Sequence, residues 1–267
     1  MPLGLGGATR VYVIVGDPIA QVKAPGSLTA ALQRRGHDAI VVPIHVSPDH
    51  VDRFIDTMGP IRNLDGIIVT VPHKFAASCH CTSLSDRARF LGAVNMMRRN
   101  PDGSWDGDML DGVSFLAAMR RAGHDPAGQR VLHVGAGGAG RAIALALAEA
   151  GARDLAIHDE DTIRRDDLIV RLHRAGWTAS RVGSPDPAGA DIVVNATPSG
   201  MGSGDPPPVD IARLSSAMHV GDVITVPEIT PLLAHARSIG CTTQSGIDMF
   251  DAQLDLMVNF LKGQRAE

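Results

Sequence analysis

A run of glycine and alanine at 135–140, Gly-Ala-Gly-Gly-Ala-Gly, is the strongest chemical motif in this chain of 267 residues. It follows a predicted strand, 130–134, and opens a predicted helix, 139–150, rich in Ala and Leu. In that context the first glycine permits a tight turn, the second lets backbone approach a pyrophosphate, and the third lets helix and strand pack closely. Free N–H groups at the helix start then meet the phosphates. We therefore predict a dinucleotide site at Gly135, Ala136, Gly137, Gly138 and Ala139, with a turn that binds no ligand as the alternative.

A carboxylate follows at the spacing expected for a contact with the adenosine ribose. Asp159 comes just after the next predicted strand, 154–157, and lies 24 residues beyond Gly135, close to the ~20 typical of such sites. An acid at this point repels the 2′-phosphate of NADP, so the sequence favours NAD. Arg164 and Arg165 follow, but we expect them on the next helix. A surface aspartate in a turn is the alternative.

A third polar cluster, Asn195-Ala196-Thr197-Pro198, follows the predicted strand 191–194. Strand ends on this edge of an open α/β sheet line the nucleotide crevice, so we expect Asn195 and Thr197 to contact the cofactor. An Asn that only caps the turn is an equal alternative.

Candidate proton-transfer groups lie in the N-terminal half. Lys74 follows Val71-Pro72-His73 at the end of the predicted strand 66–71, and Asp111 lies where the two halves of the chain join. A Lys beside an Asp in a cleft can move the hydroxyl proton of a secondary alcohol while a dinucleotide takes the hydride. A solvated surface lysine is the alternative for Lys74 taken alone. For His73 we favour packing over a relay role, since no carboxylate partner is evident.

The elements that must position these residues alternate between strand and helix. Strands are predicted at 10–15, 39–46 and 66–71, and again at 130–134, 154–157, 178–182, 191–194, 219–224 and 240–244. Such alternation predicts an α/β fold with parallel sheets covered by helices on both sides. The segment 74–111 interrupts the rhythm and is expected to be rich in loops. Two domains follow: 1–111 with 248–267 for substrate and catalysis, and 112–247 for the dinucleotide.

At this point the sequence resembles the shikimate and quinate dehydrogenases over nearly its whole length. The matching segments are Val15-Gly-Asp-Pro-Ile-Ala20, Val69-Thr-Val-Pro-His-Lys74, Gly92-Ala-Val-Asn95, Asp111-Gly112, Gly135 to Arg141, Asn195-Ala-Thr-Pro-Ser-Gly200, and Gly246, Met249 and Gln253 near the C-terminus. The resemblance implies a three-layer α/β substrate domain, a Rossmann domain and a last helix that returns to the first domain. It also implies that Lys74 and Asp111 form the catalytic pair and that Thr70, Asn95 and Gln253 contact substrate. Val223, Gly246 and Met249 would line the nicotinamide side.

Departures from the family pattern fall on the substrate anchors. The family's entry motif carries two serines that hold the substrate carboxylate, and here they are Val22 and Ala24. Where the family has an asparagine, this chain has Ile68, and where the family has Asn-Thr-Asp, it has Met109-Leu110-Asp111. The tyrosine that is usual in the family aligns with Thr225. Each lost hydrogen-bonding partner costs roughly 1–3 kcal/mol in a dry site. We therefore predict an active dehydrogenase with a shifted, less polar substrate, whereas Lys23 beside the lost serines is expected to face solvent.

Composition restricts the remaining classes. A net charge of −4 and an aromatic content of 3% argue against nucleic-acid and membrane partners. The three cysteines are expected to stay reduced, and the histidines show no H-x-x-x-H spacing, so we expect no metal. The N-terminus lacks the features of a secretory signal, which favours the cytoplasm. We expect a small-molecule substrate and leave a homodimer open. A methylene-tetrahydrofolate-type dehydrogenase and a non-catalytic NAD-binding regulator are the alternative functions.

Overall fold

The computed structural model describes residues 5–20 and 22–263. The chain forms two compact units, the first from residues 1–110 and 254–267 and the second from 111–253. The expected boundaries, after 111 and before 248, thus lie one and six residues from the observed ones. Gln21 of the altered entry motif and the first residues of the N-terminus, where no secretory signal was expected, lie outside the described part.

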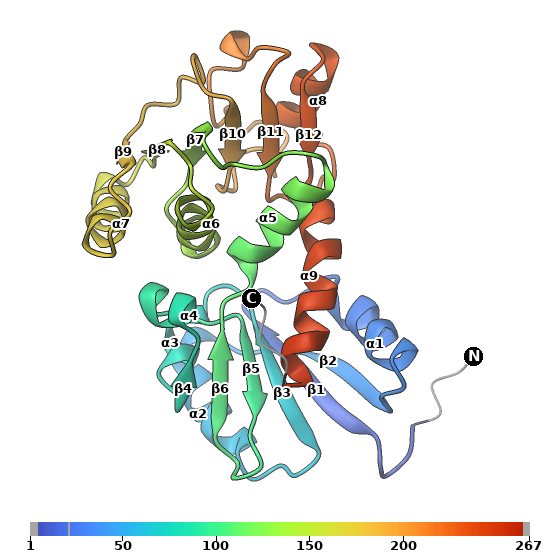
Figure 1. Ribbon diagram of the computed structural model, residues 1–267. Helices are drawn as coiled ribbons and strands as arrows, with labels where there is room; N and C mark the ends of the chain where they lie inside the picture. Colours follow the sequence, from blue (N-terminus) through green and yellow to red (C-terminus); the bar gives the residue numbers. More distant parts are fainter. Residues whose placement is uncertain (1–4, 21, 264–267) are drawn as a thin grey trace. The chain divides into compact units, whose positions relative to one another are not determined.

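The first unit contains a mixed six-stranded sheet in the order β2-β1-β3-β5-β6-β4 (Figure 1). Its strands are β1 (Arg10–Gly16), β2 (Ala39–His45), β3 (Leu64–Val69), β4 (Ser83–Leu84), β5 (Met96–Arg99) and β6 (Trp105–Asp108). The first three are parallel, so their carboxyl ends meet at one edge of the sheet. β5 runs antiparallel to both β3 and β6.

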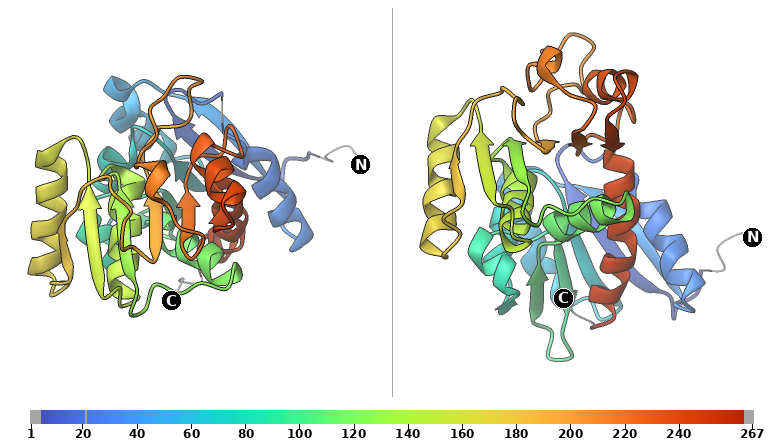
Figure 2. Two further views of the ribbon diagram at one scale, coloured as in Figure 1. Left: turned by 90° about the horizontal axis from the view of Figure 1, so that it is seen from above. Right: turned by 45° about the horizontal axis from the view of Figure 1, so that its top comes forward.

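The helices of this unit are α1 (Ala24–Arg34), α2 (Val51–Met58) after a 3₁₀ turn (Pro48–His50), α3 (Lys74–Ser78) and α4 (Asp86–Leu91). The second half of α9 (Gly246–Leu261) also belongs here and lies beside α1 in Figure 2. Arg35, directly after α1, donates to Asp255 and Asn259 on α9 at 2.7 and 2.8 Å. The end of α9 is close to β3, because a Cβ at Gly66 would lie 2.7 Å from Leu261.

The segment 74–111 differs from the expectation of a loop-rich pause. It contains α3, β4, α4, β5 and β6, and its strands extend the first sheet. These elements have two to six residues, shorter than the windows in which hydrophobic periodicity can be recognised. β5 reads Met-Met-Arg-Arg and contains no β-branched residue. The three strands predicted in this half are parallel as expected, and the sheet is mixed because β5 lies in the segment that was expected to be loop.

The second unit contains a parallel six-stranded sheet in the order β12-β11-β10-β7-β8-β9. Its strands are β7 (Arg130–Val134), β8 (Asp154–His158), β9 (Ser180–Val182), β10 (Ile192–Asn195), β11 (His219–Asp222) and β12 (Thr242–Gln244). Its helices are α5 (Asp111–Arg121), α6 (Gly138–Glu149), α7 (Thr162–Arg174), a 3₁₀ turn (Ile211–Arg213), α8 (Pro231–Ser238) and the first half of α9. The strand order reverses between β7 and β10, which makes the edge at their carboxyl ends the expected ligand site.

Helices cover both faces of the second sheet. On one face Leu132 and Val134 of β7 belong to a buried cluster with Leu232 and Leu233 of α8. On the other face the alternate residue His133 lies against the start of α6. The α/β prediction with a Rossmann-type half is confirmed.

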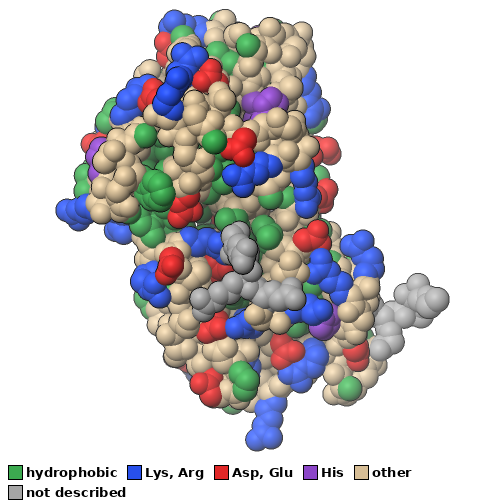
Figure 3. All heavy atoms as spheres, viewed as in Figure 1, with side chains coloured by type: hydrophobic (Ala, Val, Ile, Leu, Met, Phe, Trp, Pro, Cys, Tyr) green, Lys and Arg blue, Asp and Glu red, His purple; other side chains and the backbone are tan. Residues whose placement is uncertain are grey.

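Two general properties bear on possible partners. Within residues 5–20 and 22–263, no helix is both long and apolar enough to cross a membrane. On the face shown in Figure 3, acidic and basic side chains are interspersed rather than gathered by sign.

Candidate functional site

A pocket of about 660 Å³ lies at the carboxyl edge of the second sheet. That volume lies within the range usual for small-molecule and cofactor sites. Among its lining residues are Gly135 and Gly137 of the glycine-rich loop, Asp159 after β8, and Thr197 after β10. The loop 198–208, rich in Pro and Gly, closes another side. Four of the residues predicted to bind the dinucleotide therefore come together around one pocket.

The glycines of the loop are required for different physical reasons. Gly135 has a φ of +108°, a conformation that other residues rarely adopt. A Cβ at Gly140 would lie 2.1 Å from the carbonyl oxygen of Gly135, so the helix can approach the strand only with glycine there. At Gly137 no protein atom lies within 4 Å of a Cβ, so this position is open on the side where a ligand would approach. Gly137 is the N-cap of α6 and gives it no side-chain cap, which leaves backbone N–H groups for an anion.

Asp159 lies in the pocket wall but its carboxylate already has protein partners. The backbone N–H of Ala136 donates to Oδ2 at 2.6 Å and that of Asp161 donates to Oδ1 at 2.8 Å. Arg164, on α7, donates to the same Oδ1 at 3.3 Å and also lines the pocket. A guanidinium thus lies at the pocket rim together with Asp159 and Glu160.

Asn195 is fully buried and acts as the centre of a turn. Its Oδ1 accepts from the N–H and hydroxyl of Thr197 at 3.0 and 2.7 Å, and its Nδ2 donates to Asp222 at 3.2 Å. Asp222 also accepts from Thr230 at 2.8 Å, and burial raises the pKa of its carboxyl. This network gives Asn195 the turn-capping role, while Thr197 is the residue that reaches the pocket.

Val223, Gly246 and Met249, which the resemblance assigns to the nicotinamide side, lie at the end of β11 and the start of α9. A Cβ at Gly246 would lie 2.4 Å from the carbonyl oxygen of Val223, so helix and strand end are in direct contact. Met249 is buried and Val223 is half-buried.

Asp111 is the first residue of α5 and is buried. Gln253, on α9, donates to its Oδ1 at 3.0 Å. The next residue, Gly112, lets α5 cross α6 closely, because a Cβ there would lie 2.1 Å from the carbonyl oxygen of Ala142. Within the second unit, a hydrogen bond thus links Asp111, a predicted catalytic residue, to Gln253, a predicted substrate-binding residue.

Lys74 begins α3 in the first unit and is half-buried. Its carbonyl oxygen accepts from the N–H of Val94 at 2.9 Å, which ties α3 to the loop before Asn95. Thr70 follows β3 and contacts Gly16 at the end of β1, since a Cβ at Gly16 would lie 2.4 Å from its methyl group. Lys74 and Thr70 therefore lie at or just beyond the carboxyl ends of the parallel strands.

Asn95 and Asp108 fix the segment that precedes Asp111. Asn95 is buried, and its Oδ1 accepts from the N–H of Leu110 at 2.9 Å. Asp108 is 1% exposed and accepts from Arg87 at 2.8 and 2.6 Å and from the N–H of Met109 at 2.7 Å. Burying a charge requires such pairing. The Arg87–Asp108 ion pair could not be expected from the sequence, because the two residues lie 21 positions apart.

The altered entry motif lies between β1 and α1. Ala24 is buried at the first position of α1, Val22 is half-buried, and Lys23 is exposed. Before them, the carboxylate of Asp17 lies 2.6 Å from Nε2 of His45, at the ends of β1 and β2. The two positions of the family's lost serines thus carry apolar side chains, and Asp17, earlier in the same segment, is paired with an imidazole.

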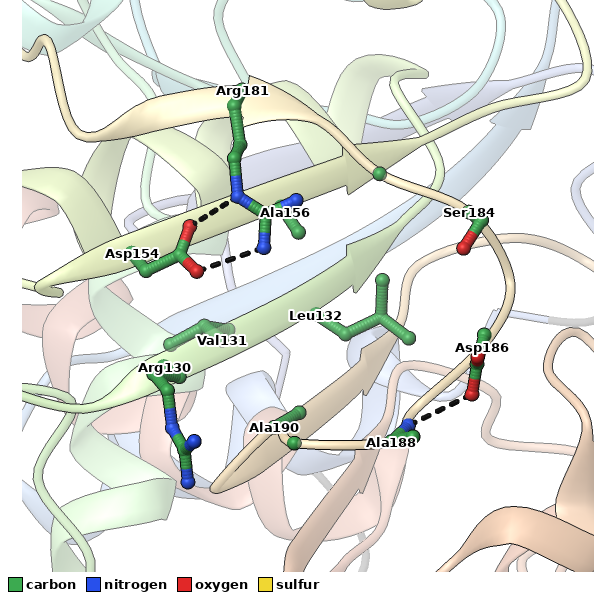
Figure 4. A pocket seen from close by; sticks show the side chains of 12 residues that line it. Arg130, Val131, Leu132, Asp154, Ala156, Arg181, Ser184, Asp186, Ala188 and Ala190 are labelled. Carbon is green, nitrogen blue, oxygen red and sulfur yellow. Dashed lines mark hydrogen bonds and ion pairs between the residues drawn. The ribbon is translucent and has the colours of Figure 1, made fainter.

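His73 and a second pocket have structural explanations. The ring of His73 is 1% exposed and its Nε2 lies 2.7 Å from the carbonyl oxygen of Val46, so His73 packs as expected. A pocket of about 200 Å³ lies among β7, β8 and the loop after β9 (Figure 4). It reaches the amino ends of these strands, and its Arg130 and Arg181 are paired with Asp191 and Asp154. Its position and neutralised arginines make it unsuitable for the dinucleotide.

Comparisons with known proteins give matches over nearly the full chain. Residues 14–97 match the family model of the shikimate dehydrogenase substrate binding domain. A shikimate dehydrogenase (NADP(+)) of Rhodospirillum rubrum is 36% identical over 256 residues, 91% of this chain and 88% of that protein. The ligand-free 5-ketofructose reductase of Gluconobacter sp. strain CHM43 is 29% identical with a TM-score of 0.88, covering 98% of this chain and 96% of that one. The quinate dehydrogenase of Corynebacterium glutamicum in complex with NAD is 28% identical with a TM-score of 0.87, covering 97% and 95%. The resemblance drawn from the motifs is confirmed and is favoured over the methylene-tetrahydrofolate-type alternative.

The predicted preference for NAD over NADP is wrong. The R. rubrum protein and three further relatives, 34–36% identical to this chain, are all named for NADP(+), whereas the quinate dehydrogenase with NAD is less similar. The structure supplies a physical reason. The prediction required Asp159 to be a free acceptor for the ribose, but its oxygens are bonded to loop N–H groups and paired with Arg164.

Proposed function

Because this chain belongs to the shikimate dehydrogenase family, whose members are NAD(P)-dependent oxidoreductases, we propose that it interconverts a secondary alcohol and a ketone with NADP(H). The observation that carries this proposal is the pocket at the glycine-rich loop, which joins an open helix N-terminus to an arginine at its rim. The N–H groups of α6 suit a pyrophosphate, and Arg164 suits the 2′-phosphate. When bound, the dinucleotide supplies the hydride donor or acceptor.

Lys74 and Asp111 are the proposed proton-transfer pair. In the reducing direction the Lys74 ammonium donates a proton to the carbonyl oxygen of the substrate, and in the oxidising direction the amine takes the hydroxyl proton. Asp111 is the proposed partner carboxylate in this proton transfer. Gln253, bonded to Asp111 at 3.0 Å, fixes the orientation of that carboxylate. Thr70 and Asn95 are proposed to contact hydroxyl groups of the substrate.

We further propose that the substrate is a neutral polyhydroxylated ketone or its alcohol rather than a carboxylate. Val22 and Ala24 stand where the family pattern has two serines that hold the carboxylate of the substrate. Neither of these two side chains can donate a hydrogen bond to a carboxylate. A 5-ketofructose reductase of the same fold, 29% identical, acts on a compound of this class and so supports the proposal.

The test is NADPH oxidation followed by absorbance, with 5-ketofructose and 3-dehydroshikimate as the two ketones. We expect turnover of the neutral ketone with a kcat/KM well above that of the acid. Efficient turnover of dehydroshikimate with a low KM would contradict the proposed substrate but not the dehydrogenase. Binding of NADP⁺ without turnover of any polyhydroxylated ketone or alcohol would contradict the proposed reaction and favour the regulator.

A further inference from the structure

His133 is a polar residue at a place where the strand otherwise buries apolar side chains. It lies in β7, two residues before the glycine-rich loop, and is 0% exposed. Its Nε2 is 2.8 Å from the carbonyl oxygen of Gly135, so this nitrogen must carry the proton and donate. Its Nδ1 is buried with no hydrogen-bond partner among the described residues. The imidazole therefore makes a hydrogen bond to the loop while leaving its other nitrogen unsatisfied.

The bond from His133 is one of two that hold a single peptide unit. The carbonyl of Gly135 and the N–H of Ala136 belong to the same planar peptide. His133 donates to the carbonyl at 2.8 Å, and Asp159 accepts from the N–H at 2.6 Å. Both side chains are buried, and they come from the ends of neighbouring strands, β7 and β8. We call His133 and Asp159 the peptide clamp, because together they fix the orientation of this peptide.

The orientation matters because of what surrounds the Gly135 carbonyl. The carbonyl oxygen lies under the first turn of α6, where only a glycine at 140 leaves it room. The next carbonyl, of Ala136, accepts from Arg141 Nε at 3.0 Å. With both carbonyls engaged by side chains, the N-terminus of α6 keeps its N–H groups for a ligand. A reversed 135–136 peptide would lose both clamp bonds.

We propose that His133 is a positioning residue for the dinucleotide, which acts by holding the Gly135–Ala136 peptide in the orientation that phosphate binding requires. The inference rests on the proposed function of this pocket. It also gives Asp159 a different task from the ribose contact expected from its spacing: the carboxylate is the second half of the clamp. Burial lowers the pKa of His133 to about 4, so the ring is neutral at neutral pH and keeps one donor and one acceptor nitrogen.

The test compares His133→Met with His133→Gln, two unbranched side chains of similar size that differ in the amide N–H donor. We expect Met to raise the Kd for NADP⁺, measured by calorimetry, by about tenfold or more, and Gln to restore it to within about threefold of wild type. At saturating cofactor, kcat should change by less than about twofold in both. The matched control is His219→Met, since His219 is also a buried histidine of this sheet with an unsatisfied nitrogen, but on β11. The His219→Met variant should bind NADP⁺ with the wild-type Kd even if its Tm is lower.

Equal Kd values for wild type and His133→Met, or an equal loss in His219→Met, would overturn the inference while the proposed function stands. Wild-type protein that fails to bind NADP⁺ would overturn the proposed function and this inference together. A second measurement needs no variant: the nitrogen chemical shifts of His133 should report the Nε2–H tautomer both with and without NADP⁺. An Nδ1–H tautomer would contradict the clamp.

Discussion

Lys74 and Asp111 owe their positions to backbone contacts at the ends of short structural elements. Lys74 starts α3 and is tied by its carbonyl to Val94, while Asp111 starts α5, where Gly112 permits close packing on α6. Both residues could be named from the sequence as candidates for proton transfer, because each lies in a motif that the family resemblance identifies. His133 and Arg141 could not be assigned their roles, since both act on backbone carbonyls whose directions are a property of the folded loop.

Replacing Lys74 by Ala removes the proposed proton donor and should lower kcat by a factor of ~10²–10⁴. The Kd for NADP⁺ should stay at the wild-type value, because Lys74 does not belong to the unit that holds the pocket. Lys262→Ala, an exposed lysine of the same unit, is the control and should retain full activity. Steady-state turnover close to wild type in Lys74→Ala would show that the pair is misassigned.

Arg164→Ala should raise the KM for NADP⁺ by about tenfold, which corresponds to ~1.4 kcal/mol, and should change the KM for NAD⁺ much less. The guanidinium is half exposed at the pocket rim, so its attraction to a 2′-phosphate is partly screened by solvent. Its neighbour Arg165 is paired with Asp166 and serves as the control. An equal rise in the KM for NADP⁺ and for NAD⁺ would show that Arg164 does not bind the 2′-phosphate.

At the scale of elements, the strands of the repeating strand–helix pattern could be predicted, and the elements of the segment 74–111 could not. The strands 130–134 and 10–15 have the β-branched pattern of buried strands and agree with β7 and β1 to within a residue. The antiparallel β5 has no such pattern, and its place beside β3 depends on pairing over a distance in the sequence. The turn between β7 and α6 was predictable because its glycines are a steric requirement rather than a preference.

Two glycine substitutions, one in that turn and one in the first turn of α6, should have different effects. Gly140→Ala places a methyl group 2.1 Å from a backbone oxygen, so it should destabilise the ligand-free protein by about 1–3 kcal/mol and lower the Tm. Gly137→Ala meets no protein atom within 4 Å and should keep the wild-type Tm, but its methyl group should block the pyrophosphate and weaken NADP⁺ binding. Thermal melts and calorimetry distinguish the two. An unchanged affinity of Gly137→Ala for NADP⁺ would show that the phosphates do not bind at this loop.

At the scale of the whole molecule, the second unit should be sensitive to acid. Burial lowers the pKa of His133 and of His219 from 6.5 to about 4. Between these values the unfolded chain binds more protons than the folded one, so stability falls as the pH is lowered from about 6.5 to 4. Each histidine contributes up to about 1.4 kcal/mol per pH unit. Urea unfolding at pH 7, 6 and 5 should show this slope, and the double variant His133→Gln/His219→Gln should reduce it. If the free energy of unfolding depends on pH equally in the wild type and in the double variant, the acid sensitivity does not come from these two histidines.

The fold and the dehydrogenase class of this protein are those of its family, whereas we propose that its substrate differs. The sequence alone indicated this, because Lys74 and Asp111 are retained while Val22 and Ala24 replace the anchoring serines. The cofactor was mispredicted from the spacing of Asp159, since spacing does not reveal that loop N–H groups occupy its oxygens.

The most direct test of a neutral substrate is the double variant Val22→Ser/Ala24→Ser, which restores both hydroxyls. Two hydrogen bonds to a carboxylate are together worth ~3 kcal/mol or more, so kcat/KM for 3-dehydroshikimate should rise by about 100-fold relative to that for 5-ketofructose. The measurement is the ratio of the two kcat/KM values in wild type and variant, with NADPH at saturation. We predict a wild-type ratio in favour of 5-ketofructose that falls in the variant by about two orders of magnitude. A wild-type preference for dehydroshikimate, or a ratio that the two serines leave unchanged, would contradict the account.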